Sequence, residues 1–251
     1  MATILAQVGW RPTLVEGGYR TWRRHVTHQL YARPLPHRVV LLDGLTGTAK
    51  TQILGRAAEL GVQILDLEAL AAHRGSLFGT LPDQAQPSQK LFETRLLQAL
   101  ENLDPHRPVL VEAESSKIGQ RMVPPALWQS MLAAPGIDIL APPAARAAYL
   151  TWAYSDIIAD PERLKTVLTA LPGRHGRKQL AKWLELVDAG DYQALAAALM
   201  AAHYDPAYVQ GRSPRISLGE IALEDLLPGS QQSAAVRVAD LMQAYGDRPC
   251  A

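Results

Sequence analysis

A glycine-rich turn followed by a Lys-Thr pair is the part of this chain best suited to chemistry. Residues 39–51 read as a short apolar strand, a tight turn and the start of a helix. Such a turn lets backbone N–H groups converge on a phosphate, and the positive N-terminal end of the helix adds to the attraction. A lysine supplies a full charge, and the threonine hydroxyl is a ligand for Mg²⁺. The expected phosphate-binding residues are Gly44, Thr46, Gly47, Thr48, Ala49, Lys50 and Thr51.

One position departs from the usual pattern of such turns, G-x-x-x-x-G-K-S/T. Ala49 stands where the pattern has its second glycine. The extra methyl group either crowds a bound phosphate or is tolerated, and the sequence leaves both open. A strand–turn–helix corner without a ligand is the alternative interpretation. The order of strand, turn, Lys-Thr and helix favours a phosphate-binding loop.

Two carboxylates lie at the end of a later apolar run, residues 108–111. Glu112 and Glu114 are two residues apart, so on a strand they project to the same face. Acidic groups at the end of a buried strand are costly unless they are paired. We therefore expect both to be catalytic, with Glu112 and Thr51 next to a Mg²⁺ ion. A pair of solvated loop carboxylates is the alternative.

Three further groups of residues could contact a phosphate or RNA. His73 and Arg74 offer a group that titrates near neutral pH and a planar fork for a phosphate, so both are catalytic candidates. Basic residues interleaved with aromatic ones suit an RNA backbone and unstacked bases. The RNA-binding candidates are Arg23, Arg24, Arg174, Arg177 and Lys178. For all three groups, a merely solvated surface is the alternative.

The composition limits the class of protein. The chain has 251 residues, of which 48% are hydrophobic, and its formal net charge is +1. This charge does not mark the whole chain as a nucleic-acid binder. A single cysteine, Cys250, excludes disulfides within the chain. No apolar run reaches the roughly 18 residues that a membrane-spanning helix needs. We expect a cytoplasmic protein without a membrane partner.

Strands and helices alternate in the first part of the chain. The expected strands are 38–42, 62–65, 108–111 and 138–140, and this alternation predicts an α/β fold with a parallel sheet and helices on both faces. Ligands of such sheets bind beyond the carboxyl ends of the strands, where the glycine turn lies. From residue 143 onward we expect almost only helices, at 143–158, 161–171, 175–189, 191–203 and 231–245.

Several segments together resemble the tRNA 2-selenouridine synthase family. The most specific is His73–Gly79, His-Arg-Gly-Ser-Leu-Phe-Gly. The others are 44–51, 66–68, 86–89 with 92–93, 111–115 with 118–119, and Tyr-Asp-Pro-Ala-Tyr at 204–208. The resemblance covers most of the chain, about 36 to 210. It implies a P-loop NTPase-like sheet with helices on both faces, followed by a mostly helical C-terminal part.

Members of this family have an N-terminal rhodanese-like domain with a catalytic cysteine, and a P-loop domain. Residues 9–26 look like the last strand and helix of the first, so we expect 1–33 to be its remnant. The P-loop domain is expected at 36–228, and a C-terminal helix and tail at 229–251. Because Cys250 lies at the wrong end to replace the rhodanese cysteine, the chain looks like a truncated or split member.

The resemblance also implies a transferase that acts on the wobble 2-thiouridine of tRNA. Geranyl diphosphate, bound by the P-loop domain, geranylates the sulfur, and selenium from selenophosphate then replaces the S-geranyl group. The second step is expected to need a rhodanese-like partner in trans. Two alternatives remain open. The turn and carboxylates alone fit a P-loop kinase or nucleotidase, and loss of the glycine at Ala49 fits a non-catalytic RNA-binding remnant.

Overall fold

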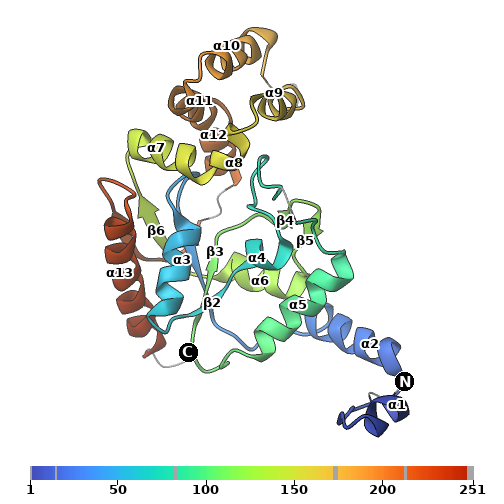
Figure 1. Cartoon of the computed structure of the whole chain (residues 1–251). Coiled ribbons are helices and arrows are strands. Elements are labelled where there is room, and N and C mark those ends of the chain that lie inside the picture. The colour runs from blue at the N-terminus through green and yellow to red at the C-terminus, as the bar shows by residue number, and fades with distance from the viewer. Residues whose placement is uncertain (1, 15, 82–83, 172–174, 212–213, 248–251) are drawn as a thin grey trace.

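The computed structural model describes residues 2–14, 16–81, 84–171, 175–211 and 214–247. A five-stranded parallel sheet lies at its centre (Figure 1) in the order β2-β3-β1-β6-β7. The strands are β1 (Val39–Asp43), β2 (Gln63–Leu65), β3 (Val109–Glu112), β6 (Gly136–Leu140) and β7 (Ser217–Ala222). A separate antiparallel hairpin consists of β4 (Lys117–Ile118) and β5 (Arg121–Met122).

Helices cover both faces of the sheet. One face packs against α3 (Lys50–Glu59) and α13 (Pro228–Gly246). The other packs against α2 (Gly18–Tyr31), α4 (Leu67–Ala71), α5 (Gln89–Glu101) and α6 (Pro125–Ala133). Alternate side chains of β1 enter the two cores, because successive residues of a strand point to opposite faces: Val40 and Leu42 join the first core, Val39 and Leu41 the second.

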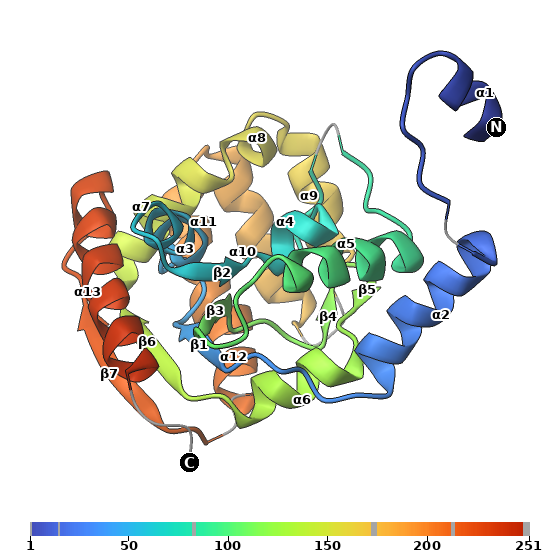
Figure 2. The same ribbon diagram turned by 90° about the horizontal axis from the view of Figure 1, so that it is seen from below.

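A helical lobe lies over the end of the sheet at which β1 runs into α3 (Figure 1). It comprises α7 (Pro143–Ala153), α8 (Ser155–Ile158), α9 (Pro161–Thr169), α10 (Arg177–Asp188), α11 (Tyr192–Leu199), a π-helical segment η1 (Met200–Tyr204) and α12 (Asp205–Gly211). It has its own core around Leu168, Trp183 and Leu195. Figure 2 shows α1 (Ala2–Gln7) standing away from the body. Among the described helices, none combines the length and apolarity needed to cross a bilayer.

The predicted α/β fold with a mostly helical part after residue 143 is confirmed, with one exception. The strand β7 joins the sheet beside β6, and the sequence did not indicate it. Only Ile221 of this edge strand is buried, so it lacks the apolar run that marked β1 and β3. Two predicted helices also differ in extent. The segment 143–158 divides at Tyr154, and the helix expected at 191–203 continues through η1 into α12.

Both ends of the chain contribute to these cores. Val26 and Leu30 of α2 are fully buried in the core with α5 and α6, and Val238 of α13 is fully buried against α3. The Arg23 guanidinium forms an ion pair with Glu93 of α5, whose side chain is only 2% exposed. The hydroxyl of Tyr31 donates a second hydrogen bond to Glu93 at 2.7 Å. The helix α2 is therefore held by both apolar packing and a buried charge.

Arg23→Ala should lower the free energy of unfolding by about 2 kcal/mol, because it leaves the buried carboxylate of Glu93 without its cation while Tyr31 still bonds to it. Arg24→Ala is the matched control, since this neighbouring side chain is exposed and should change stability by less than about 0.5 kcal/mol. Denaturant unfolding measures both. Equal stability of the two variants would contradict the docking of α2 through this ion pair.

Candidate functional site

The loop between β1 and α3, residues 44–51, is called the phosphate loop here. Gly47 has a φ of 84°, and a Cβ on it would lie 2.9 Å from Cγ of Leu150, so only glycine fits. Ala49 also adopts a left-handed conformation, with a φ of 59°, and is 3% exposed. An L-residue pays about 1–2 kcal/mol for this conformation. The left-handed backbone at position 49 explains why the usual pattern has glycine there. Ala49 keeps the same loop conformation at the cost of this strain.

Lys50 lies across this loop. Its Nζ donates a hydrogen bond to the carbonyl oxygen of Gly44 at 2.8 Å, and it lies 3.9 Å from Oε1 of Glu112. The lysine charge is thus held between the loop backbone and a buried carboxylate. A phosphate bound at the loop would meet this charge at close range. The side chain of Thr48 turns inward instead and donates to the carbonyl of Leu45 at 2.9 Å.

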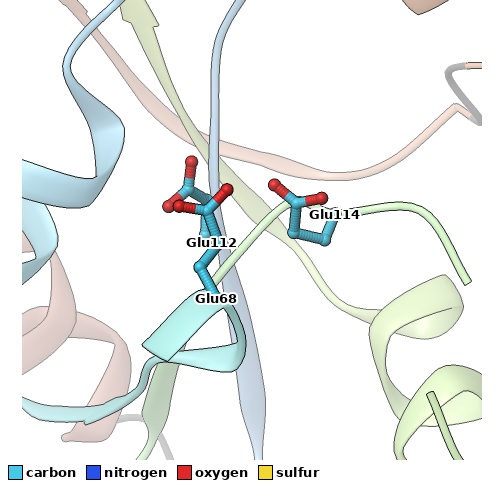
Figure 3. Close-up of side chains that lie close together, drawn as sticks. All are labelled: Glu68, Glu112 and Glu114. Atoms are coloured by element: carbon cyan, nitrogen blue, oxygen red, sulfur yellow. The ribbon is translucent and has the colours of Figure 1, made fainter. Parts of the chain in front are cut away.

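Three carboxylates form a cluster (Figure 3), and one of them, Glu112, is the carboxylate next to Lys50. Glu112 ends β3, Glu114 follows it, and Glu68 lies in α4 directly after β2. One oxygen from each lies within 4.8 Å of the others. The hydroxyl of Thr51 donates to Glu112 at 3.0 Å and lies 3.3 Å from Glu68. An all-oxygen donor set of this kind is the chemistry that Mg²⁺ prefers.

Burial and mutual repulsion change the acidity of this carboxylate cluster. Burial, with Glu112 and Glu114 nearby, raises the pKa of Glu68 to about 9. Burial and the charge of Glu112 raise the pKa of Glu114 to about 8. Burial also raises the pKa of Glu112, although Lys50 opposes the shift. Glu68 and Glu114 therefore retain protons near neutral pH unless a cation compensates them.

The segment His73–Gly79 separates two residues that the sequence analysis treated together. His73 is 8% exposed and lies against Gly79 and Gly119, where a Cβ on either glycine would be 2.7 Å from its ring. Burial lowers its pKa. A large cavity lies beside the phosphate loop and the carboxylate cluster. Arg74 is among the described residues that line this cavity, and His73 is not. The structure thus packs His73 against Gly79 and Gly119, away from the lining of that cavity, and its catalytic role stays a prediction.

Arg74 and Gly75 lie on the cavity side. The guanidinium of Arg74 is 2.9 Å from the carboxylate of Asp156 in α8 and lies 5.2 Å from the ring centre of Tyr154. A Cβ on Gly75 would be 2.6 Å from Glu68 and 2.8 Å from Glu114. Only a glycine therefore lets this loop pass so close to the carboxylate cluster, while its neighbour pairs with the helical lobe.

The late segment 204–208 reaches back to the phosphate loop. Arg146 of α7 is 2% exposed; its Nε donates to the carbonyl of Thr46 at 2.8 Å. Its two terminal nitrogens donate to Asp205 at 2.6 and 3.0 Å. The hydroxyl of Tyr208 accepts a hydrogen bond from the backbone N–H of Gly44 at 3.2 Å. The helical lobe is therefore bonded to the phosphate loop at Gly44 and at Thr46.

Most of these groups line one cavity of 690 Å³, although Arg146, Asp205 and His73 are not among its described lining residues. It brings together the phosphate loop, the carboxylate cluster and Arg74, and it extends to Trp128 of α6. The sequence analysis predicted most of these residues but assigned no role to Glu68, Arg146 or Tyr208. Glu68 follows a strand at the same sheet edge as Glu112. The rule that ligands bind beyond the carboxyl ends of parallel strands could therefore have identified Glu68 from the sequence.

The RNA-binding candidates have different surroundings. Arg24, Arg177 and Lys178 are exposed, the last two at the start of α10. Arg23 has a structural partner in Glu93. Arg174 and Cys250 lie outside the described residues. RNA binding at these positions stays a prediction.

Comparison with known proteins places these features in a family. A sequence model of the tRNA 2-selenouridine synthase AAA domain matches residues 37–162. The tRNA 2-selenouridine synthase of Shewanella loihica is 31% identical over 232 residues, covering 81% of this chain and 61% of that protein. The one from Verminephrobacter eiseniae is 33% identical over 244 residues, covering 85% and 64%. The chain thus spans less than two thirds of the length of these relatives.

Similarity to solved structures is weaker. A shikimate kinase from Bacteroides thetaiotaomicron is 14% identical with a TM-score of 0.36, covering 82% of this chain and 98% of that chain, a likeness that carries no conclusion. The family match is different, because residues 37–162 include the phosphate loop, the carboxylate cluster and Arg146. By that match, this chain belongs to the tRNA 2-selenouridine synthase family.

Proposed function

We propose that this protein is a transferase that moves a geranyl group from geranyl diphosphate to the sulfur of the wobble 2-thiouridine of a tRNA. The resemblance to the family suggests the substrates. The observation that carries the proposal is the meeting of Lys50, the phosphate loop and three carboxylates in one cavity. A diphosphate held at the loop would leave most of that 690 Å³ cavity for a prenyl carbon and a base.

The residues present suit a reaction in which diphosphate leaves. The thiocarbonyl sulfur attacks the first carbon of the geranyl group, the C–O bond breaks, and its electron pair departs with the diphosphate. The uridine N3 proton leaves to water. Lys50 and the N–H groups of the phosphate loop stabilise the charge that develops on the leaving oxygens. Arg74 lies on the same cavity and is a second candidate for this charge.

A magnesium ion fits the same arrangement. Glu112 and the hydroxyl of Thr51 would hold it, with Glu68 and Glu114 completing an oxygen donor set. Its chemistry would be to neutralise part of the diphosphate charge. The protein's own part is to keep the carboxylates together and to orient Lys50 toward the loop.

The selenium step is proposed for a partner. The resemblance to the family implies that exchange of the S-geranyl group for selenium from selenophosphate depends on a rhodanese-like cysteine. We assign that step to a rhodanese-like protein acting in trans, and geranyl transfer to the chain described here.

Lys50→Ala should slow geranyl transfer about 100-fold, because a charge-assisted contact to a desolvated oxyanion is worth on the order of 3 kcal/mol. Lys90→Ala, an exposed lysine on α5, is the matched control and should leave the rate unchanged. Mass spectrometry of thiolated tRNA incubated with geranyl diphosphate and Mg²⁺ detects the S-geranyl nucleoside. Equal rates for the two variants would refute the diphosphate assignment.

The same incubation with ATP separates the alternatives. ATP turnover that geranyl diphosphate does not affect would replace the proposal with a P-loop kinase or nucleotidase. Binding of tRNA without transfer from any donor would identify a non-catalytic RNA-binding protein.

Joint replacement of Arg177 and Lys178 by alanine should weaken tRNA binding and reduce its salt dependence. Each lost phosphate contact lowers the slope of log affinity against log salt by about 0.7–0.9, so two contacts remove roughly 1.5. The control replaces Lys90 and Arg95 of α5, which removes the same charge elsewhere. Binding titrations at several salt concentrations measure the slopes. Identical slopes for both double variants would place the RNA surface away from α10.

Stability without divalent ions should fall as the pH rises. Because the pKa of Glu68 is raised from 4.5 to about 9 and that of Glu114 to about 8, the folded protein binds more protons than the unfolded chain in this range. The free energy of unfolding therefore decreases with pH, by at least about 2 kcal/mol between pH 6 and 9.

Glu68→Gln should flatten this profile, and the exposed Glu59→Gln on α3 should not. Denaturant unfolding in the presence of a chelator measures the profile. Stability that holds constant or rises from pH 6 to 9 in the wild-type protein would contradict the raised pKa values. Added Mg²⁺ should restore most of the loss at pH 9.

A further inference from the structure

A second, smaller cavity lies in the helical lobe. It has a volume of 70 Å³ and lies among α7, α8, α9 and α11, beside Phe78 of the loop 73–79. Its lining includes the apolar side chains of Ile157, Leu164, Leu195 and Leu199. None of these residues lines the 690 Å³ cavity. The geometry requires an explanation, because well-packed cores have few voids larger than a water molecule.

The two cavities share one boundary. Thr46, Ser76, Leu150, Tyr154 and Tyr204 line both of them. Thr46 belongs to the phosphate loop, so the small cavity begins where a bound phosphate would end. At the boundary, the hydroxyls of Ser76 and Tyr154 are hydrogen-bonded to each other at 2.7 Å. These two polar groups are thus already paired with each other, beside an apolar interior.

The lining selects the kind of group that can enter. A ribose or a nucleobase carries several donors and acceptors, and these would find few partners among leucine and isoleucine side chains, which makes their burial costly. A hydrocarbon chain has no such requirement. A cavity with an apolar lining binds apolar groups. The lining therefore favours a hydrocarbon over a nucleoside as the substituent on the phosphate.

The volume limits the length of that hydrocarbon. An apolar cavity of about 150 Å³ binds benzene, which is about 25 Å³ per carbon, so a cavity of 70 Å³ takes about three carbons of a chain. The part of the ligand next to the phosphate would remain in the larger cavity. The small cavity thus accommodates about three carbons at the far end of a tail.

We propose that this apolar cavity holds the distal part of the hydrocarbon tail of a diphosphate ester and that its lining determines the tail length the protein accepts. The inference rests on the proposed function, because it requires the diphosphate to bind at the phosphate loop. It adds residues outside that loop, in α8, α9 and α11, that discriminate between donors.

The test measures binding of inorganic pyrophosphate and of dimethylallyl, geranyl and farnesyl diphosphate to the whole chain with Mg²⁺. Burial of one methylene is worth about fourfold in affinity, so burial of about three carbons of the geranyl tail in the cavity should improve binding at least 30-fold over dimethylallyl diphosphate. Farnesyl diphosphate should bind no more tightly than geranyl diphosphate, because its last unit exceeds the cavity.

Ala196→Leu fills the cavity, since Ala196 lines it, and Ala197→Leu on the exposed side of the same helix is the matched control. The first variant should lose at least tenfold in affinity for geranyl diphosphate and keep its affinity for pyrophosphate. The second should change neither. Thermal unfolding of both variants checks that they fold, and Leu164→Ala should extend tight binding to farnesyl diphosphate.

Three results would overturn the inference. The first is equal affinity for pyrophosphate and geranyl diphosphate. The second is an equal effect of Ala196→Leu and Ala197→Leu on binding of geranyl diphosphate. The third is tighter binding of farnesyl than of geranyl diphosphate to the wild-type protein. In each of these cases, binding of pyrophosphate would still support the proposed diphosphate site, so only the inference would fail. Failure of every diphosphate to bind would overturn the proposed function together with the inference.

Discussion

The rest of the site depends on the partners of one buried guanidinium, that of Arg146. A cation with 2% exposure is stable only if its donors are satisfied, and this one is shared by the carbonyl of Thr46 and the carboxylate of Asp205. The arginine therefore ties the phosphate loop, α7 and α12 to one another. The hydroxyl of Tyr208 adds a second contact between α12 and the loop at Gly44. A change in the position of the helical lobe must alter the phosphate loop as well, and the reverse also holds.

The carboxylate cluster violates the usual rules of protein interiors. Glu68, Glu112 and Glu114 are held close together although their charges repel and burial disfavours ionisation. Lys50 offsets only part of this charge from 3.9 Å. The left-handed backbone of Ala49 in the same region is a second local cost. Such costs are typical of functional sites, where the arrangement that a ligand requires outweighs local stability.

The two cavities give the helical lobe a role beyond covering the sheet. Its helices form the walls of the 70 Å³ cavity, and its residues Tyr149, Tyr154 and Tyr204 line the larger one. Arg74 reaches the lobe through Asp156. The sheet therefore supplies the phosphate loop and the carboxylates, while the lobe supplies walls of both cavities. Under the proposed function, this division gives a common phosphate-binding arrangement its preference for one donor.

The sequence by itself determined the features that depend on neighbouring residues. Apolar runs at β1 and β3 predicted buried parallel strands, and the spacing from Gly44 to Thr51 predicted the loop, because both patterns are local. Only the tertiary structure decided which distant residues meet. It joined Glu68 to the carboxylates and bonded Arg146 to Asp205, 59 positions along the chain, and it separated His73 from the cavity that its neighbour Arg74 lines. The edge strand β7 escaped prediction because pairing with β6, rather than an apolar run, forms it. Long-range contacts depend on how the layers pack, and no local pattern records that packing.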